Sequence, residues 1–294
     1  MIDLHIHTTS SDGSDEPKEI LIKAQRLGLK YISITDHDSI GAYEKLSALK
    51  IGDYYEGGII PGCEFSVVHE GYPIEILGYG MDLDTLRSDG LISDERFLER
   101  ENTYLKKMTE ICRNLNIKCS DNLSIKNSKY FATQIMHADL RKYPENKNHF
   151  TEEVWESVNA FYRTCVNNSE SPFFLEQTKN YPTIQEASAL IKKAGGMAFL
   201  AHLYGYFTED HQCFLDSLVS LSVLDGIECY HSLHSLERTN ILLTYCREHR
   251  LFASGGSDYH GKVKPDVNIG ESIDGLKIPY EILEPWLPAN TIYV

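Results

Sequence analysis

Two hydrophobic periods alternate along the first ninety positions of the chain. Residues 2–7 alternate between apolar and polar side chains, and short apolar or β-branched runs recur in "YISITDHD", "GIIPGCEFSV" and "IEILGYG". Both patterns are typical of strands. Residues 17–27 instead place apolar side chains every three or four positions, and Gly28 follows where a helix would end. This region therefore predicts strand–helix units.

The middle of the chain has a different pattern. A long helical period over residues 94–115 carries an apolar stripe, polar segments rich in Asn and Lys follow it, and residues 154–165 are again helical in pattern. We interpret residues 92–182 as a mostly helical insertion that forms a cap domain. The insertion would interrupt a single domain formed by residues 1–91 and 183–294.

Strand–helix alternation returns after the insertion. Thr183 and Glu186 have the spacing of a capping box at the start of a helix. "MAFLAH", "DGIECYH" and "LFASGGSDYH" predict strands, with a helix over residues 236–247 before the last of them. Repeated strand–helix units predict an α/β protein with a parallel sheet, either open or closed into a barrel.

The predicted strands end in side chains that bind metal ions. In a β/α barrel the carboxyl ends of the strands meet at one face. Residues i and i+2 of a strand point the same way, about 6–7 Å apart, so an H-x-H pair can face one site. One such pair is often coincidental, but metal-binding types at nearly every strand end indicate a metal site. With Asp12, which follows the first strand, these residues are His5, His7, Asp36, His37, Glu64, Glu75, His202, His231, Asp258 and His260.

The number of these side chains predicts more than one ion. Imidazole and carboxylate ligands together suit Zn, Mn or Fe. Five imidazoles and three carboxylates exceed what one ion can coordinate, so we expect two to three divalent ions. Such ions would attract phosphate, provide hydroxide at neutral pH and stabilise both oxygens of an in-line displacement. The residues counted are His5, His7, Asp12, His37, Glu64, His202, Asp258 and His260.

Composition narrows the choice of partners. The 294 residues carry a formal net charge of −15 and no basic stripe. This argues against long nucleic acid as the main partner and favours a small substrate. No run approaches the roughly 18 apolar residues of a membrane helix, and there is no room for a signal peptide before the first strand. Seven cysteines without a C-x-x-C pair suggest a reducing compartment. We therefore expect a cytoplasmic protein that binds no membrane.

Six motifs together resemble those of one family. The motifs "DLHIHTTSSDGS", "ISITDHDSIGA", "IIPGCEFS", "ALIKKAGGMAFLAH", "LDGIECYHSLHS" and "ASGGSDYHG" are similar, in order, to those of the polymerase-and-histidinol-phosphatase (PHP) family of metal-dependent phosphoesterases. The resemblance covers residues 1–90 and 183–270 and is to the stand-alone branch, which includes nucleoside phosphate phosphatases and short-RNA exonucleases. It implies a distorted (β/α)7 TIM-like barrel with a trinuclear metal centre.

The resemblance also implies roles for individual residues. One ion would be held by His5, His7, Glu64 and Asp258, a second by Glu64 and His202, and a third by Asp12, His37 and His260. A metal-bridging hydroxide would attack the substrate, so no side chain need act as the nucleophile. Asp36 would lie behind the ligands and orient a ligand histidine or a metal-bound water.

Two positions depart from the family pattern. Glu75 stands where relatives usually have a histidine, and Leu203 stands where they have a proline. A glutamate in a buried strand is rarely left unpaired, so we expect Glu75 to face the metals, directly or through a water. The alternative is an ion pair between Glu75 and a cation of the cap. As an oxygen ligand, Glu75 would shift the metal preference from Zn²⁺ towards Mn²⁺.

The expected function is hydrolysis of a small, nucleotide-like phosphomonoester. His231 and His234 follow a predicted strand end and are candidates for substrate contact, and Arg238 and Lys264 are candidate phosphate-binding cations. One alternative is a 5′–3′ exonuclease on short oligonucleotides. Another is a metal-binding regulatory barrel without catalytic activity, if Glu75 disables the second ion site.

Overall fold

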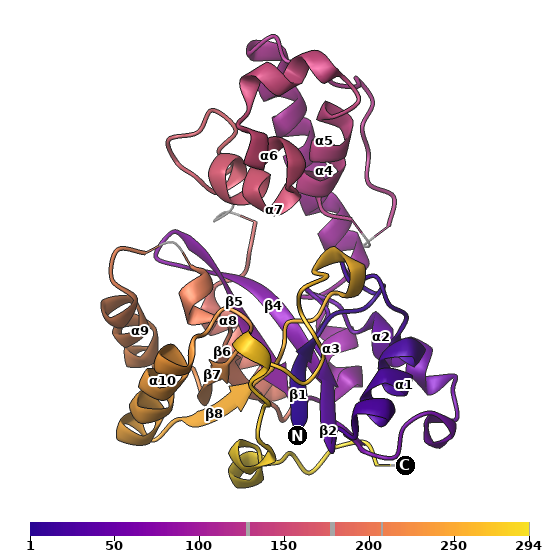
Figure 1. The fold of residues 1–294 in the computed structure, drawn as a ribbon, viewed down its shortest axis with the longest axis vertical. Coiled ribbons are helices and arrows are strands. Elements are labelled where there is room, and N and C mark those ends of the chain that lie inside the picture. Colours follow the sequence, from indigo (N-terminus) through magenta and orange to yellow (C-terminus); the bar gives the residue numbers. More distant parts are fainter. Residues whose placement is uncertain (128–129, 177–179, 207, 294) are drawn as a thin grey trace. The chain divides into compact units, whose positions relative to one another are not determined.

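The chain forms two compact units in the computed structural model (Figure 1). Residues 1–93 and 181–294 make up the first unit, and residues 94–180 make up the second. All described strands belong to the first unit. No helix in the described part of the chain is long and apolar enough to cross a membrane. The structure describes residues 1–127, 130–176, 180–206 and 208–293.

The described strands of the first unit form two sheets. Strands β1, β2 and β3 are parallel, and β4 to β8 follow one another in a second sheet. In that sheet β5 runs antiparallel to β4 and β6, whereas β6, β7 and β8 are parallel. The strands are β1 (Ile2–Ile6), β2 (Tyr31–Ile34), β3 (Gly58–Ile59), β4 (Gly62–His69), β5 (Tyr72–Tyr79), β6 (Met197–Leu200), β7 (Gly226–Tyr230) and β8 (Phe252–Gly255).

The predicted α/β class is confirmed, but the predicted closed, parallel barrel is not shown. The described strands pair as two sheets, and β5 is antiparallel to both of its neighbours. The cause is the link between β4 and β5, which contains only Glu70 and Gly71. Both residues have positive φ angles, 48° and 86°, as a two-residue hairpin turn requires. A turn this short can join only antiparallel strands.

Two isolated bridges connect the two sheets. Ile6 pairs with Tyr259, and His37 pairs with Glu64, both in parallel fashion. The segments that follow β1, β2 and β8 therefore lie together at one edge, beside β4. These segments carry most of the predicted metal ligands.

Helices of the first unit alternate with its strands along the sequence. The first predicted helix is observed with the predicted bounds, and Gly28 ends it with a left-handed φ of 66°. Thr183 and Glu186 form the predicted capping box at the start of α8. Three short helices were not predicted: α2, α3 and α9. The helices are α1 (Pro17–Leu27), α2 (Gly41–Ser47), α3 (Leu83–Asp89), α8 (Ile184–Lys193), α9 (His211–Ser220) and α10 (Leu236–His249).

The second unit has its own apolar core. Leu105, Met108, Met136 and Phe161 are among its fully buried side chains. The single helix predicted over residues 154–165 is instead divided, because the hydroxyl of Ser157 accepts a hydrogen bond from the amide of Ala160 and starts a new helix. The helices are α4 (Asp94–Asn114), α5 (Ala132–Leu140), α6 (Glu152–Glu156) and α7 (Val158–Phe161), with a π-helical turn over Tyr162–Val166. The role of this unit as a cap stays a prediction.

Strand β1 is buried along its whole length. Ile2 and Leu4 pack in an apolar cluster with Phe199. Because side chains alternate along a strand, Asp3 and His5 point to the opposite side. Burial of a carboxylate and an imidazole there requires polar partners, and these partners form the site described next.

Candidate metal centre

Glu64 lies at the middle of a buried cluster of imidazoles. The Nε2 atoms of His5 and His7 are 3.1 Å apart, and each is 3.1 Å from Oε2 of Glu64. The Nδ1 atom of His37 is 3.2 Å from the same oxygen. The other oxygen, Oε1, is 2.9 Å from Nε2 of His202. The two oxygens of one carboxylate therefore face two different groups of imidazoles.

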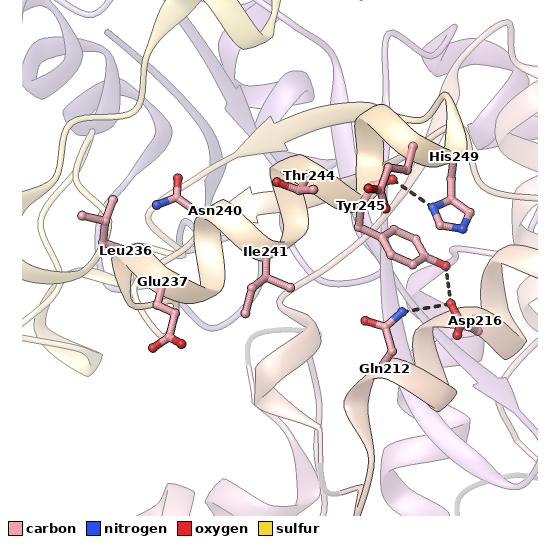
Figure 2. A pocket seen from close by; sticks show the side chains of 10 residues that line it. Gln212, Asp216, Leu236, Glu237, Asn240, Ile241, Thr244, Tyr245 and His249 are labelled. Carbon is pink, nitrogen blue, oxygen red and sulfur yellow. Dashed lines mark hydrogen bonds between the residues drawn. The ribbon is translucent and has the colours of Figure 1, made fainter.

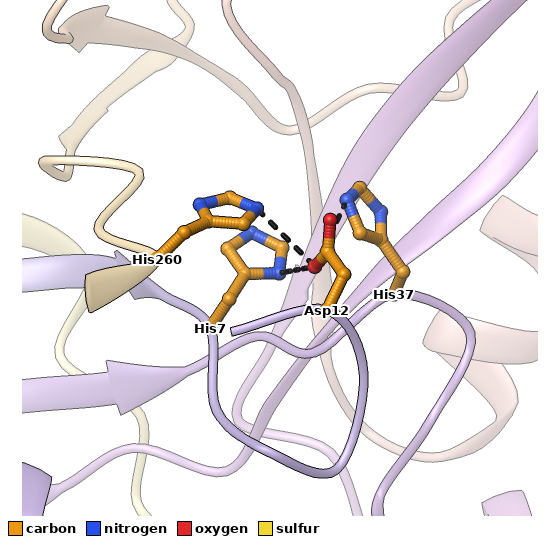
Figure 3. Close-up of side chains that lie close together, drawn as sticks. All are labelled: His7, Asp12, His37 and His260. Atoms are coloured by element: carbon orange, nitrogen blue, oxygen red, sulfur yellow. Dashed lines mark ion pairs between the residues drawn. The ribbon is translucent and has the colours of Figure 1, made fainter. Parts of the chain in front are cut away.

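Asp12 gathers a second set of imidazoles from three segments (Figure 3). Its Oδ1 atom lies 3.2 Å from Nε2 of His260, 3.6 Å from Nδ1 of His7 and 3.9 Å from Nε2 of His37. His7 and Asp12 follow β1, His37 follows β2 and His260 follows β8. Seven of the nine predicted ligands are thus within one connected cluster of carboxylates and imidazoles.

The remaining two predicted ligands, Asp258 and Glu75, border the same cluster. Oδ1 of Asp258 lies 3.4 Å from Nε2 of His7 and 3.6 Å from Nε2 of His5. Oε2 of Glu75 lies 3.4 Å from Nε2 of His202. The groups that can share an ion include His37, Glu64 and Glu75, as well as His5, His7 and Asp258. The structure therefore brings all nine predicted ligands together.

The contacts of His260 fit a cation in the cluster. Its Nδ1 atom is 2.9 Å from the carbonyl oxygen of Asp258, which can only accept, so Nδ1 carries a proton. Burial lowers the pKa of His260 to about 4, so the ring is neutral at pH 7. Its Nε2 lone pair then faces the Asp12 carboxylate at 3.2 Å. Two acceptors in contact need a positive charge between them, and this donor set suits Mn, Zn or Fe.

In the ion-free chain, protons on two imidazoles supply part of the positive charge that the cluster needs. Burial lowers the pKa of His7, but its hydrogen bonds with Asp258 and Glu64 outweigh burial and raise that pKa to about 9. For His202, burial is likewise outweighed by Glu64 and Glu75, which raise its pKa to about 9. These two rings are therefore protonated at pH 7 when no ion is bound.

Glu228 is a functional residue that the sequence reasoning missed. It lies on β7, is fully buried, and accepts a hydrogen bond from Nδ1 of His5 at 2.9 Å. Its other oxygen accepts from the backbone amide of His202 at 2.8 Å. Glu228 thus turns Nε2 of His5 towards the cluster. The available signal was a glutamate between Ile227 and Cys229 in an otherwise apolar strand.

Asp3 was also missed and joins segments that are distant in sequence. Its carboxylate accepts hydrogen bonds from the Ser257 amide at 2.9 Å, from the Ser257 hydroxyl at 2.6 Å and from the Gly270 amide at 2.7 Å. Burial raises the pKa of Asp3 to about 6. This carboxylate fixes β1 against the segment that carries Asp258.

Asp36 orders the loop after β1. Its carboxylate accepts hydrogen bonds from the Thr8 amide and hydroxyl, both at 2.7 Å, and from the Ser11 hydroxyl at 2.6 Å. Ser11 in turn lies 3.5 Å from Nδ1 of His7. Among the described contacts, Asp36 therefore reaches a predicted ligand histidine through Ser11, and it holds the loop that presents Asp12.

The four predicted substrate contacts divide into two pairs. Nε2 of His231 lies 3.3 Å from Oδ2 of Asp258, and Nζ of Lys264 lies 2.5 Å from the same oxygen. His234 is buried and pairs through Nδ1 with the carbonyl oxygen of Cys229 at 3.1 Å. Arg238 is exposed and lies over the ring of Tyr204. Only the first pair contacts predicted ligands within the described structure.

A pocket of about 910 Å³ lies elsewhere, between α9 and α10 (Figure 2). In it Asp216 accepts hydrogen bonds from the Tyr245 hydroxyl at 2.7 Å and from Gln212 at 3.1 Å. None of the nine predicted ligands lines this pocket. Among the described residues, its carboxylates form no group of converging metal ligands.

Comparison with known proteins identifies the family. The PHP domain matches residues 3–149, which is half of the chain, and the chain belongs to this family. It is 26% identical to the phosphoribosyl 1,2-cyclic phosphate 1,2-diphosphodiesterase of Eggerthella lenta, covering 91% of this chain and 97% of the relative. It is 25% identical to the 3',5'-nucleoside bisphosphate phosphatase of Chromobacterium violaceum, covering 93% and 92%. It is 24% identical to the 5'-3' exoribonuclease Rnm of Escherichia coli, covering 98% and 90%.

A solved structure shares the fold. An amidohydrolase from Chromobacterium violaceum, solved with sulfate bound and without metal, superposes with a TM-score of 0.71 at 21% identity. The match covers 99% of this chain and 97% of that protein. The likeness therefore extends over both units and shows that the strand and helix order is shared.

We expect loss of Glu228 to disturb both the fold and the metal centre. Glu228→Ala leaves the Nδ1 proton of His5 and the amide of His202 without acceptors. The free energy of unfolding should fall by about 3 kcal/mol, and affinity for Mn²⁺ should fall about 10–100-fold. Urea unfolding and calorimetric titration measure the two effects. Glu237→Ala, an exposed change on α10, is the control and should alter neither. Unchanged Mn²⁺ affinity in Glu228→Ala would contradict this role.

Ion binding should release protons at pH 7. The pKa values of His7 and His202 are raised to about 9, so both rings are charged at pH 7 and must lose a proton to coordinate an ion. Affinity for Mn²⁺ should therefore increase as pH rises from 6 to 9. Calorimetry in buffers of different ionisation enthalpy measures the release directly. A binding enthalpy that does not depend on the buffer at pH 7 would show the rings to be neutral beforehand.

Proposed function

We propose that the chain hydrolyses a small phosphomonoester of nucleotide size with divalent ions as cofactors. The broader class follows from the family and its relatives, whose names are phosphatase, phosphodiesterase and exoribonuclease. The chain is thus a hydrolase of phosphate esters. The proposed ion ligands are His5, His7, Asp12, His37, Glu64, Glu75, His202, Asp258 and His260.

The arrangement of Glu64 is the observation that carries the proposal. One of its oxygens faces His5, His7 and His37 at 3.1–3.2 Å, and the other faces His202 at 2.9 Å. A carboxylate placed in this way can bridge two ions. Bound ions would supply charge stabilisation for a phosphoryl group and an activated water. The chain itself supplies buried ligands whose orientation is fixed by Glu228 and by the Asp258 carbonyl.

The charge of the protein supports a small substrate. With a formal net charge of −15, the protein repels a long polyanion, whereas a single phosphate can approach a local positive centre. Two of the relatives are named for small phosphorylated compounds. The proposed substrate is therefore one phosphate ester group on a small molecule.

A short oligonucleotide is the second candidate substrate. The Escherichia coli exoribonuclease aligns with 98% of this chain, including the residues of the second unit. An exonuclease would bind several nucleotides along a groove with aromatic or basic side chains. Measuring kcat/KM on substrates with increasing numbers of nucleotides would distinguish the two candidate substrates.

Activity should depend on bound ions and should favour small substrates. Dialysis against a chelator should abolish phosphate release from mononucleotides, and added Mn²⁺ should restore it. His260→Ala should lower activity about a hundredfold or more because the ring contacts Asp12 in the cluster. His249→Ala, which changes a ring stacked on Tyr245 outside the cluster, is the matched control.

Colorimetric phosphate assays on mononucleotides and on a 20-nucleotide strand give the kcat/KM ratio. Full activity after chelation, or a higher kcat/KM on the longer strand, would contradict the proposal.

Glu75 is the proposed oxygen ligand beside His202. Burial and the neighbouring Glu64 raise the pKa of Glu75, and a cation beside this carboxyl would favour its ionised form. Its backbone is fixed by the Tyr206 hydroxyl, which lies 3.0 Å from the Glu75 amide and 3.2 Å from its carbonyl oxygen.

Glu75→Ala should therefore lose one ion while the other ions are retained. Elemental analysis of the purified wild type and variant, both loaded with Mn²⁺, measures the stoichiometry. Glu75→His is the matched variant: it should retain the ion and shift the preference from Mn²⁺ towards Zn²⁺. Equal metal content in wild type and Glu75→Ala would remove Glu75 from the ligand set.

A further inference from the structure

Lys264 is a cation at the edge of the candidate metal centre. Its Nζ atom lies 2.5 Å from Oδ2 of Asp258. Among the described residues it is the only lysine or arginine with a recorded ion pair to one of the four carboxylates of the centre. Its side chain is 29% exposed, so the ammonium group lies at the boundary between the buried cluster and solvent.

The two oxygens of Asp258 have different partners. Oδ1 faces the imidazoles of His5 and His7 at 3.6 and 3.4 Å. Oδ2 faces Nζ of Lys264 and Nε2 of His231. An ion bound on the Oδ1 side would therefore share Asp258 with the ammonium group on the Oδ2 side.

The loop between the two residues holds Lys264 in place. Asp258 has a left-handed φ of 59°, a conformation that costs a non-glycine residue roughly 1 kcal/mol or more. A 3₁₀ turn over Gly261–Val263 follows, and the Lys264 amide donates to the Gly261 carbonyl at 3.2 Å. The lysine is thus presented to Asp258 by a short, hydrogen-bonded turn rather than by a free side chain alone.

The contact between Lys264 and Asp258 should depend on whether an ion is bound beside Asp258. In the ion-free chain the ammonium group balances one buried carboxylate, which would otherwise be costly. A divalent ion near Oδ1 would neutralise Asp258 and repel the ammonium group. The positive charge of Lys264 would then be available to an anionic ligand at the mouth of the centre.

We propose that Lys264 exchanges partners: it is the counter-ion of Asp258 when no metal is bound, and it holds an anionic phosphate oxygen once the metal is bound. The second half rests on the proposed function. The first half concerns ion binding alone. Lys264 would therefore have opposite effects on the binding of the two ligands: it would weaken metal binding and strengthen phosphate binding.

Lys264→Met tests the exchange because it keeps the length of the side chain and removes its charge. Calorimetric titration should show Mn²⁺ binding to the ion-free variant about tenfold more tightly than to wild type, since a like charge is gone. Inorganic phosphate should bind the Mn²⁺-loaded variant about tenfold more weakly, since a charge-assisted contact is gone. The melting temperature in chelator should fall, and saturating Mn²⁺ should narrow the difference from wild type.

Two further variants separate charge from structure. Lys264→Arg keeps the charge and should resemble wild type in Mn²⁺ affinity. Lys262→Met removes an exposed lysine of the same turn and should change neither affinity. Opposite changes for Mn²⁺ and phosphate are not expected from a damaged fold, which would weaken both.

The possible results are distinguishable. Equal or weaker Mn²⁺ binding by Lys264→Met would overturn the counter-ion role. Tighter Mn²⁺ binding with unchanged phosphate affinity would overturn the exchange and leave the proposed hydrolase function standing. Failure of the wild type to bind Mn²⁺ at all would overturn both the proposed function and the exchange.

Discussion

The fold depends on how four neighbouring carboxylates are held among imidazoles. Asp12, Glu64 and Asp258 each lie against two or more imidazoles, and Glu75 lies against one. A buried carboxylate without such partners would cost several kcal/mol. The partners come from segments after β1, β2, β6 and β8, so each of these strands must end at the right place. The contacts within the site therefore also constrain where the strands end and how they pair.

A further layer of hydrogen bonds keeps the imidazoles in orientation. Glu228 holds His5, the Asp258 carbonyl holds His260, and Asp36 holds the loop that carries Asp12. In each case the partner is an acceptor that leaves the outer ring nitrogen or carboxylate facing the cluster. Substitutions in this layer would change ion affinity without removing any ligand.

The sequence predicted the residues of the site better than the path of the strands. The candidate ligands were recognisable because His, Asp and Glu stand where apolar strands end, as in the segment with His5 and His7. The antiparallel β4–β5 pair was not predicted, although Glu70 and Gly71 are a suitable two-residue turn. Glu228 was missed because its importance depends on a contact with His5, 223 positions away in the chain. Local patterns carry no information about such a pairing.

The carboxylate of Asp3 links the order of synthesis to the assembly of the centre. It bonds Ser257, which is 254 positions later in the chain. During translation β1 is made before the other described strands, yet the Asp3 carboxylate lacks Ser257 and Gly270 until the segment after β8 leaves the ribosome. For much of its elongation a nascent chain lacks His202, Asp258 and His260, although His5, His7 and four other candidate ligands are already present. Any ion captured at that stage would be held by a partial set of ligands, so correct metallation belongs to the finished protein.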